Sequence, residues 1–352
     1  MRPGEPMDRR DLIEWLRESD EARLEELWAR ADATRRVHVG DEVHLRGLIE
    51  VSNHCVRRCA YCGINVSNSE VKRYRMSAEE ILACARQARE LGYGTVVLQA
   101  GEDYGLTRGA VADVVRRIKD ETGLAVTLSL GERSDEDLRS WRAAGADRYL
   151  LRFETSDQEL YARIHPSLPG RLSDRFVLLR RLRELGYEVG SGVMIGIPGQ
   201  TYATLADDLQ SFVELDLDMI GVGPWLPHPV TPLGRGELPP AADSEQVPNT
   251  ELMTYKVVAL TRLLCPEANI PSTTALATLN LASGRELGLT RGANVVMPNL
   301  TPVEYRALYE IYPGKACIRE TANECVHCLS GRIVRMGRQI GRGSGGRRRG
   351  RG

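Results

Sequence analysis

Apolar and polar positions follow a repeating order along most of the chain. Short apolar runs of strand length are followed by longer stretches in which apolar residues return at helical spacing. Eight short runs predict strands, at 45–53, 95–101, 125–131, 148–154, 188–196, 218–225, 269–275 and 293–299. The longer stretches predict helices, at 77–92, 108–123, 134–145, 172–186, 201–215, 250–264 and 283–292. This alternation indicates an α/β fold with parallel strand pairing.

Eight such units in about 250 residues favour a closed (βα)8 TIM barrel over an open doubly wound sheet. The positions of the unusual residues support the barrel, because they follow the predicted strands. Cys55 follows the first strand, Glu102 the second and Pro198 the fifth, while Glu154 ends the fourth. A barrel brings all these loops to its carboxyl end, where barrel enzymes carry out their chemistry.

The regions outside the barrel pattern give the expected domain organisation. Residues 1–44 predict an N-terminal helical extension, because 11–28 is amphipathic. The barrel itself is expected at 45–312, and a short cysteine-containing segment at 313–336. The last residues, 337–352, contain six arginines, no acid and many glycines, so we expect a disordered tail.

Charge sets limits on the partners. The whole chain has a net charge of −1, so removing the six arginines of the tail leaves −7 for residues 1–336. An acidic body with a basic tail makes nucleic-acid binding through the tail the less favoured alternative. No run resembles a signal peptide or a membrane span, so we expect a cytoplasmic protein without a membrane partner. Its eight cysteines are then expected to be reduced.

Six of the eight cysteines form two groups of three. Cys55, Cys59 and Cys62 lie in CVRRCAYC, and a second group lies in CIRETANECVHC, at Cys317, Cys325 and Cys328. Clustered thiolates hold zinc or iron–sulfur clusters. A structural zinc ion needs a fourth ligand, and His54 is awkwardly adjacent to Cys55 in the chain. Three thiolates on a [4Fe–4S] cluster would instead leave one iron open for a small molecule.

The first group resembles the cysteine motif of the radical S-adenosylmethionine (SAM) superfamily. QAGED at 99–103, YLLRFETSD at 149–157 and MIGIPGQT at 194–201 are similar to further motifs of that superfamily. The resemblance implies a catalytic [4Fe–4S] cluster on Cys55, Cys59 and Cys62 that cleaves SAM to a 5′-deoxyadenosyl radical. It also implies contacts to SAM, which we assign to Tyr61, Gln99, Gly101, Glu102, Ser129, Arg152, Glu154, Arg175, Met194, Gly196 and Pro198.

Further segments, from about residue 45 to the tail, resemble the HydE family of [FeFe]-hydrogenase maturases. They include IGVGPWLPHPVTPL, IPSTTA, GANVVMPNLTP and LYEIYPGKACI. The resemblance implies a small cysteine-derived iron carbonyl/cyanide substrate, made by the partner maturase HydG, and a product passed toward the scaffold HydF. Substrate contacts are then expected from Thr273, Thr274, Met297 and Tyr309.

The same resemblance implies a second iron–sulfur cluster at Cys317, Cys325 and Cys328. Zinc, or no metal, is the alternative at this second group. For the whole protein, the alternative is a biotin-synthase-like enzyme, such as a methylornithine synthase type, that acts on another small molecule. Both of those enzymes share the barrel and the first cysteine group.

Overall fold

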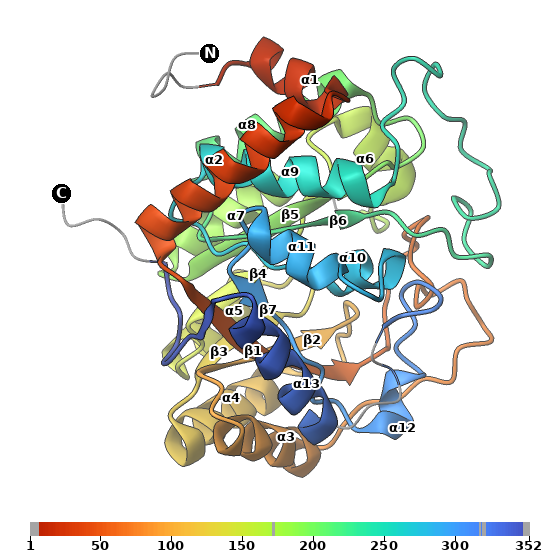
Figure 1. Ribbon diagram of the computed structural model, residues 1–352. Helices are drawn as coiled ribbons and strands as arrows, with labels where there is room; N and C mark the ends of the chain where they lie inside the picture. The colour runs from red at the N-terminus through yellow and green to blue at the C-terminus, as the bar shows by residue number, and fades with distance from the viewer. Residues whose placement is uncertain (1–6, 171–172, 317, 319–321, 348–352) are drawn as a thin grey trace.

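The computed structural model describes residues 7–170, 173–316, 318 and 322–347; within 322–327 only the backbone is described (Figure 1). The strands in this part of the chain are β1 (Glu42–Ser52), β2 (Thr95–Ala100), β3 (Ala125–Ser129), β4 (Arg148–Leu150), β5 (Glu188–Ile195), β6 (Met219–Pro224), β7 (Val295–Val296) and β8 (Gln339–Ile340). The helices are α1 (Arg9–Arg17), α2 (Glu21–Val39), α3 (Ala78–Glu90), α4 (Arg108–Thr122), α5 (Asp135–Ala143), α6 (Gln158–Ile164), α7 (Arg175–Glu184), α8 (Tyr202–Glu214), α9 (Glu251–Leu264), α10 (Thr274–Leu279), α11 (Gly284–Thr290), α12 (Val303–Arg306) and α13 (Ala322–Arg335).

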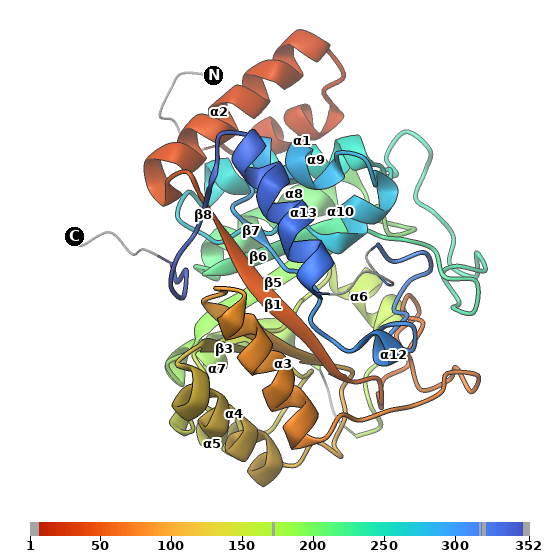
Figure 2. The same cartoon turned by 60° about the horizontal axis from the view of Figure 1, so that its bottom comes forward.

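The strands form the predicted parallel barrel. Their order is β6-β5-β4-β3-β2-β1-β7, and every pairing is parallel. Single-residue bridges close the ring, because Asn269 pairs with Met219 of β6 and Pro271 pairs with Val295 of β7. Helices α3, α4 and α5 follow one another around the outside of β1–β3 (Figure 2). The α/β barrel expected from the alternation is therefore confirmed.

The predicted strand at 269–275 is wrong in its second half. Only Asn269 and Pro271 make bridges, and α10 begins at Thr274. Pro271 has no N–H to donate to a ladder, and the Thr273 hydroxyl accepts from the N–H of Leu276 at 3.3 Å as the helix cap. A proline followed by a capping threonine thus converts the expected strand into a helix start.

The N-terminal extension consists of two helices where the pattern predicted one. Asp20 caps α2 by accepting from the N–H of Arg23, which separates α2 from α1. Figures 1 and 2 show this pair lying over the barrel helices α8 and α9, and α1 packs on α8 while α2 packs on α9. Leu12, Trp15 and Leu16 of α1 are buried in that contact.

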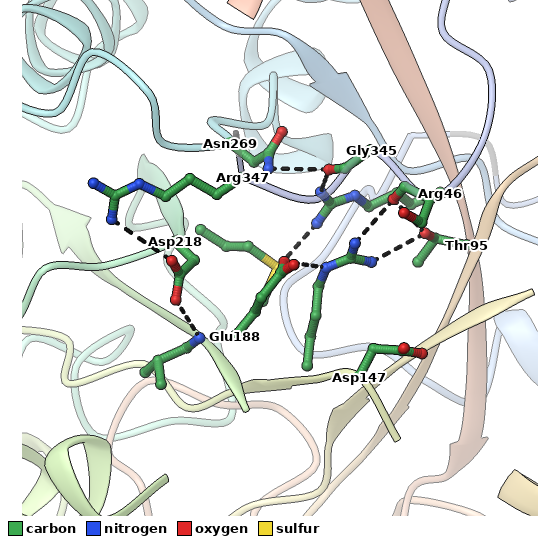
Figure 3. Close-up of polar contacts among 12 residues, drawn as sticks. Arg46, Thr95, Asp147, Glu188, Asp218, Asn269, Gly345 and Arg347 are labelled. Atoms are coloured by element: carbon green, nitrogen blue, oxygen red, sulfur yellow. Dashed lines mark hydrogen bonds and ion pairs between the residues drawn. The ribbon is translucent and has the colours of Figure 1, made fainter. Parts of the chain in front are cut away.

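The expectation of a disordered tail is wrong for residues 337–347. β8 pairs with the start of β1, and the following residues cross the amino end of the barrel. The Gly345 carbonyl accepts from Arg46 at 2.9 Å and from Asn269 at 3.1 Å (Figure 3). A Cβ on Gly94 would lie 1.6 Å from the Gly343 carbonyl oxygen, so the fit requires glycine there. We call residues 341–347 the closing strap.

The closing strap is held by polar groups and not by apolar burial, which explains the wrong expectation. The Ser344 carbonyl accepts from Arg148 at 3.0 Å and from Thr95 at 2.9 Å. Arg347 forms an ion pair with Asp216 at 2.5 Å and lies 3.6 Å from Asp218. These carboxylates compensate the charge of Arg347, which weakens the argument for a free basic tail that binds nucleic acid.

No helix in the described part of the chain is long and apolar enough to cross a membrane.

Candidate active site

The expected site residues lie at the carboxyl end of the barrel, which we call the mouth. Most of them follow the strands: Gly101 and Glu102 after β2, Arg152 and Glu154 after β4, Gly196 and Pro198 after β5, Met297 after β7. Gln99, Ser129 and Met194 are the last or second-last residues of β2, β3 and β5. Thr273 and Thr274 begin α10, Arg175 begins α7 and Tyr309 follows α12.

Cys55, Cys59 and Cys62 lie on the long loop between β1 and α3. Backbone bonds attach this loop to the mouth: the N–H of Val56 donates to the Glu102 carbonyl at 3.0 Å, and the N–H of Ala60 to the Ile164 carbonyl at 2.8 Å. The loop is also tied internally by Arg73, which sequence reasoning missed. Its guanidinium donates to four backbone carbonyls, those of Asn53, Ile64, Asn65 and Asn68.

The three thiols share one environment. Burial, together with the neighbouring thiols of Cys62 and Cys55, raises the pKa of Cys59 well above its usual value. Burial raises the pKa of Cys62 to about 12 and also raises that of Cys55. Thiols this hard to ionise become thiolate ligands when a metal takes the place of the proton.

The chemistry of the donor set suits an iron–sulfur cluster. In a [4Fe–4S] cluster each thiolate binds a different iron, so three thiols on one loop can hold it. The donor set of three soft, mutually close thiols therefore fits a cluster at this loop.

A buried charge network joins the cysteine loop to the neighbouring strands. Arg57, between Cys55 and Cys59, lies 3.0 Å from Glu102 and 2.7 Å from Glu132, and all three side chains are at most 4% exposed. Burial opposes ionisation of Glu132, but the charge of Arg175 and the Ser173 hydroxyl outweigh it and lower the pKa of Glu132. The network therefore holds the loop against β2 and β3 with paired charges.

Arg175 extends the network toward β4. Its Nε donates to Glu132 at 2.7 Å, its Nη1 donates to the Arg152 carbonyl at 2.8 Å, and its Nη2 lies 2.9 Å from His165 Nε2. Each of its three nitrogens thus has a protein partner. A direct contact between Arg175 and SAM stays a prediction, while its contact to Arg152 already fixes the backbone of the fourth loop.

His165 gives this network a measurable pH dependence. Burial, together with the charges of Arg175 and Arg57, lowers the pKa of His165 to about 3, against about 6.5 for a free histidine. Below pH 6.5 the unfolded chain therefore takes up a proton that the folded chain refuses. From pH 7.5 to 5.5, wild type should lose about 1.4 kcal/mol more unfolding free energy than His165→Gln, as measured by urea denaturation.

The control for this prediction is His38→Gln, since His38 is an exposed histidine on α2. His38→Gln should keep the acid sensitivity of the wild type. If the wild type and His165→Gln were equally sensitive to acid, His165 would take up its proton as readily in the folded chain as in the unfolded chain.

Glu154 stands out for its backbone and its side chain. Its φ is +64°, in the left-handed region that a non-glycine residue rarely adopts, and such strain is often found at functional sites. Burial raises the pKa of Glu154, which the charges of Arg152 and Arg175 partly oppose. Its Oε2 lies 3.1 Å from Arg152 Nη2, but among the described residues no well-aligned hydrogen bond reaches it. A buried acceptor of this kind fits a ligand that brings hydroxyl or amino groups.

An apolar cluster lies beside these polar groups. Tyr61 and Trp225 pack on a set of buried side chains that joins the cysteine loop to β5: Ala60, Leu160, Ile164, Met194, Ile197 and Leu233. The indole N–H of Trp225 is buried and has no hydrogen-bond partner in the described chain. This cluster places Tyr61 beside Met194 and Ile197 of the β5 motif and adds Trp225.

A second group of buried polar residues lies beside Gln99. Lys315 forms an ion pair with Glu50 of β1, and both are buried. Asn299 donates to the other Glu50 oxygen at 2.9 Å. The Lys315 ammonium lies 5.3 Å from the centre of the Tyr309 ring, whose hydroxyl accepts from Gln99 at 3.3 Å. Tyr309 is therefore fixed between β2 and the C-terminal segment.

Sequence reasoning missed Glu50, Lys315, Arg57, Glu132 and His165 as members of the site. One signal was present, because Gly131-Glu132 after β3 repeats the Gly101-Glu102 pair after β2. A single glutamate in a strand or a single lysine in a loop gives no comparable signal.

The second cysteine group is only partly described. Cys317 lies outside the described residues, and of Cys325 only the backbone, on α13, is described. Cys328 is exposed on the same helix. A second cluster at this group therefore stays a prediction.

The barrel and its cysteine loop define a class of enzyme. Residues 49–212 match the family model of the Radical SAM superfamily. In structure, the chain is similar to methylornithine synthase (PylB), with a TM-score of 0.80 and 26% identity over 96% of this chain and 95% of that one. The fold is shared with the maturase HydG, with a TM-score of 0.69 and 22% identity over 83% of this chain and 65% of that one. The class is that of the radical SAM enzymes.

The particular family follows from sequence identity over nearly the full length. The chain is 46% identical to the [FeFe] hydrogenase maturase subunit HydE of Thermotoga maritima, over 98% of this chain and 97% of that protein. It is 31% identical to 3-methylornithine synthase of Methanosarcina acetivorans, over 85% of this chain and 82% of that protein. The chain belongs to the HydE family of hydrogenase maturases. Membership of the radical SAM superfamily implies a [4Fe–4S] cluster and SAM as cofactors.

Proposed function

We propose that this protein acts in maturation of the [FeFe]-hydrogenase H-cluster, on a small sulfur-containing substrate derived from cysteine and carrying iron, carbon monoxide and cyanide. The observation that carries the proposal is the 46% identity to HydE over 98% of the chain. When bound, the cluster and SAM supply a 5′-deoxyadenosyl radical for the reaction.

The chain's own residues have separate tasks in this proposal. Cys55, Cys59 and Cys62 hold the cluster. Glu154 and Arg152, a buried acid and its neighbouring cation, hold polar groups of SAM, and a guanidinium suits a carboxylate. The apolar cluster around Tyr61 and Met194 excludes water beside them.

The substrate would lie on the inner side of the cofactor. Thr273 and Thr274, at the start of α10, offer hydroxyls to a carboxylate, and Met297 after β7 offers a soft apolar contact. Tyr309 and the Lys315–Glu50 pair are buried beside Gln99. Buried charged groups in a barrel interior suit a small polar substrate, because a polymer could not reach them.

The test is maturation of [FeFe]-hydrogenase in a defined mixture. HydG would supply the substrate and HydF would receive the product in this proposal. Cluster-loaded protein added with those two maturases should activate hydrogenase, and a Cys59→Ala protein should not. Full activation without this protein, or none with it while SAM is still cleaved, would contradict the proposal.

A second candidate has its own support. Identity of 31% to a 3-methylornithine synthase and the TM-score of 0.80 to PylB favour a radical enzyme that rearranges another small molecule. This candidate becomes the better one if the protein cleaves SAM but fails in maturation. Incubation with candidate amino acids and mass spectrometry of the products would then identify the substrate.

The second cysteine group gives a separate prediction. Changing Cys317, Cys325 and Cys328 together to alanine should lower the iron content yet keep SAM cleavage near the wild-type rate, because the group follows the barrel in sequence and the first group is intact. Iron analysis and 5′-deoxyadenosine assay would measure both. Loss of cleavage in a folded variant would place the group in the catalytic path.

A further inference from the structure

Asp208 is a fully buried carboxylate on α8 that lies behind the site and has no part in the proposed chemistry. Its hydrogen bonds come from neutral groups. Oδ1 accepts from the N–H of Ser156 at 2.5 Å, from the Ser156 hydroxyl at 2.7 Å and from the Thr155 hydroxyl at 3.3 Å. Oδ2 accepts from the side-chain amide of Gln200 at 3.2 Å. Burial raises the pKa of Asp208 to about 7, and the hydrogen bonds from Ser156, Thr155 and Gln200 oppose that rise and favour the ionised carboxylate.

The Oδ1 contacts hold the loop that carries Glu154. Glu154 has the unfavourable φ of +64°, and Thr155 and Ser156 follow it directly. On the other side, the N–H of Glu154 donates to the Gly192 carbonyl of β5 at 3.0 Å. A strained residue keeps its conformation only when both flanks are fixed. Asp208 supplies the fixed contact on the C-terminal flank.

The Oδ2 contact orients Gln200 and, through it, the β5 motif. A carboxylate only accepts hydrogen bonds, so the Gln200 amide must turn its NH2 group toward Asp208. Its Oε1 then faces the N–H of Gly196 and accepts from it at 2.7 Å, while its NH2 group also donates to the Met194 carbonyl at 3.1 Å. The Gly196 N–H, the Met194 carbonyl and Asp208 thus fix the Gln200 amide in one orientation together, so the Asp208 carboxylate supports the hydrogen bonds that hold Met194 and Gly196.

We propose that Asp208 is a positioning residue for SAM binding, which holds the Glu154 loop and the β5 motif in one geometry. The inference rests on the proposed function, in which Glu154, Met194 and Gly196 contact SAM. Both segments are fixed by the same carboxylate, so removing it changes the SAM site without touching the cysteine loop.

The test is Asp208→Asn, which keeps the shape and changes the donor pattern. The asparagine NH2 group must face either the N–H of Ser156 or the NH2 of Gln200, so one donor meets another in each orientation. We expect SAM affinity, measured by equilibrium dialysis on cluster-loaded protein, to fall by about tenfold. The cluster absorbance and iron content should be unchanged, and the Ser156 amide should exchange with deuterium faster.

The matched control is Asp207→Asn, the same change at the next residue. Asp207 is half-buried on another face of α8, where its side chain pairs with Arg9 of α1. Its affinity for SAM should equal that of the wild type. Ser156→Ala, which removes only one hydroxyl contact, should fold normally and lower the affinity about threefold.

Glu154→Gln separates this inference from the proposed function. Weak SAM binding by Glu154→Gln with wild-type binding by Asp208→Asn would overturn the positioning role and leave the SAM site in place. Wild-type binding by Glu154→Gln would remove Glu154 from the SAM site, and wild-type binding by Asp208→Asn as well would overturn the positioning role. If Asp208→Asn does not fold, wild-type affinity of Ser156→Ala overturns the positioning role.

Discussion

Replacing Cys59 by alanine is expected to reduce 5′-deoxyadenosine formation to the rate seen without protein. Cys59 is the most buried thiol of the first group, and its alanine variant leaves the cluster two protein ligands. Cys55→Ala and Cys62→Ala should have the same effect, because each thiolate holds a different iron. Anaerobic reconstitution with iron and sulfide, followed by product analysis with SAM and dithionite, measures the loss.

Cys84→Ala is the control for this prediction. Cys84 is also buried, but it lies on α3 among apolar side chains and belongs to neither cysteine group. Its variant should take up the cluster and cleave SAM as the wild type does. Continued product formation by a triple variant of the first group would show that the cluster is bound elsewhere.

Replacing Arg57 by leucine is expected to lower the free energy of unfolding by about 3–5 kcal/mol. The change leaves Glu102 and Glu132 buried, each having lost the guanidinium that bridges them at 3.0 and 2.7 Å. Since Arg57 lies between two cluster ligands, the variant should also lose its cluster faster on exposure to a chelator. Urea denaturation and the decay of cluster absorbance measure the two effects.

Arg58→Leu is the matched control, because Arg58 is the neighbouring arginine and is exposed. It should change the unfolding free energy by less than about 0.5 kcal/mol. The unfolding free energy of Arg57→Lys should lie between those of Arg57→Leu and Arg58→Leu. An ammonium keeps the charge but lacks the planar guanidinium that bridges two carboxylates. Equal stability of Arg57→Leu and the wild type would contradict a stabilising role of the guanidinium between the two buried carboxylates.

The order of the strands could be predicted from the sequence because a parallel barrel imposes a strict alternation. Six of the eight expected strands overlap an observed strand of three or more residues, and the loop with Cys55 follows the first of them. The motif residues were found because short spacings such as Cys55-x3-Cys59 are fixed by ligand geometry, which acts within one loop. Constraints that act within one loop can therefore be recognised from a single sequence.

The supporting residues could not be predicted, since each depends on a partner far away in the chain. Asp208 is one of two adjacent aspartates on α8, and nothing local shows that it faces inward while Asp207 faces outward. His165 acquires its low pKa only through Arg175 and Arg57. Lys315 pairs with Glu50, and these two residues lie far apart in the chain, one on the first strand and the other after α12.

The late strands that pair with β1 have a consequence for how the chain folds during synthesis. β1 is made early, yet two of its neighbours, β7 and β8, are made near the end, with Val43 paired to Ile340. Contacts between residues so far apart in sequence slow folding. The chain loses conformational entropy when the long intervening loop closes, before the contacts form and stabilise it. The ribosome must therefore deliver the chain as far as β7 before the barrel can close, and until then the edge of β1 is free to pair with other chains. We expect nascent chains that stop before residue 295 to depend on chaperones for solubility.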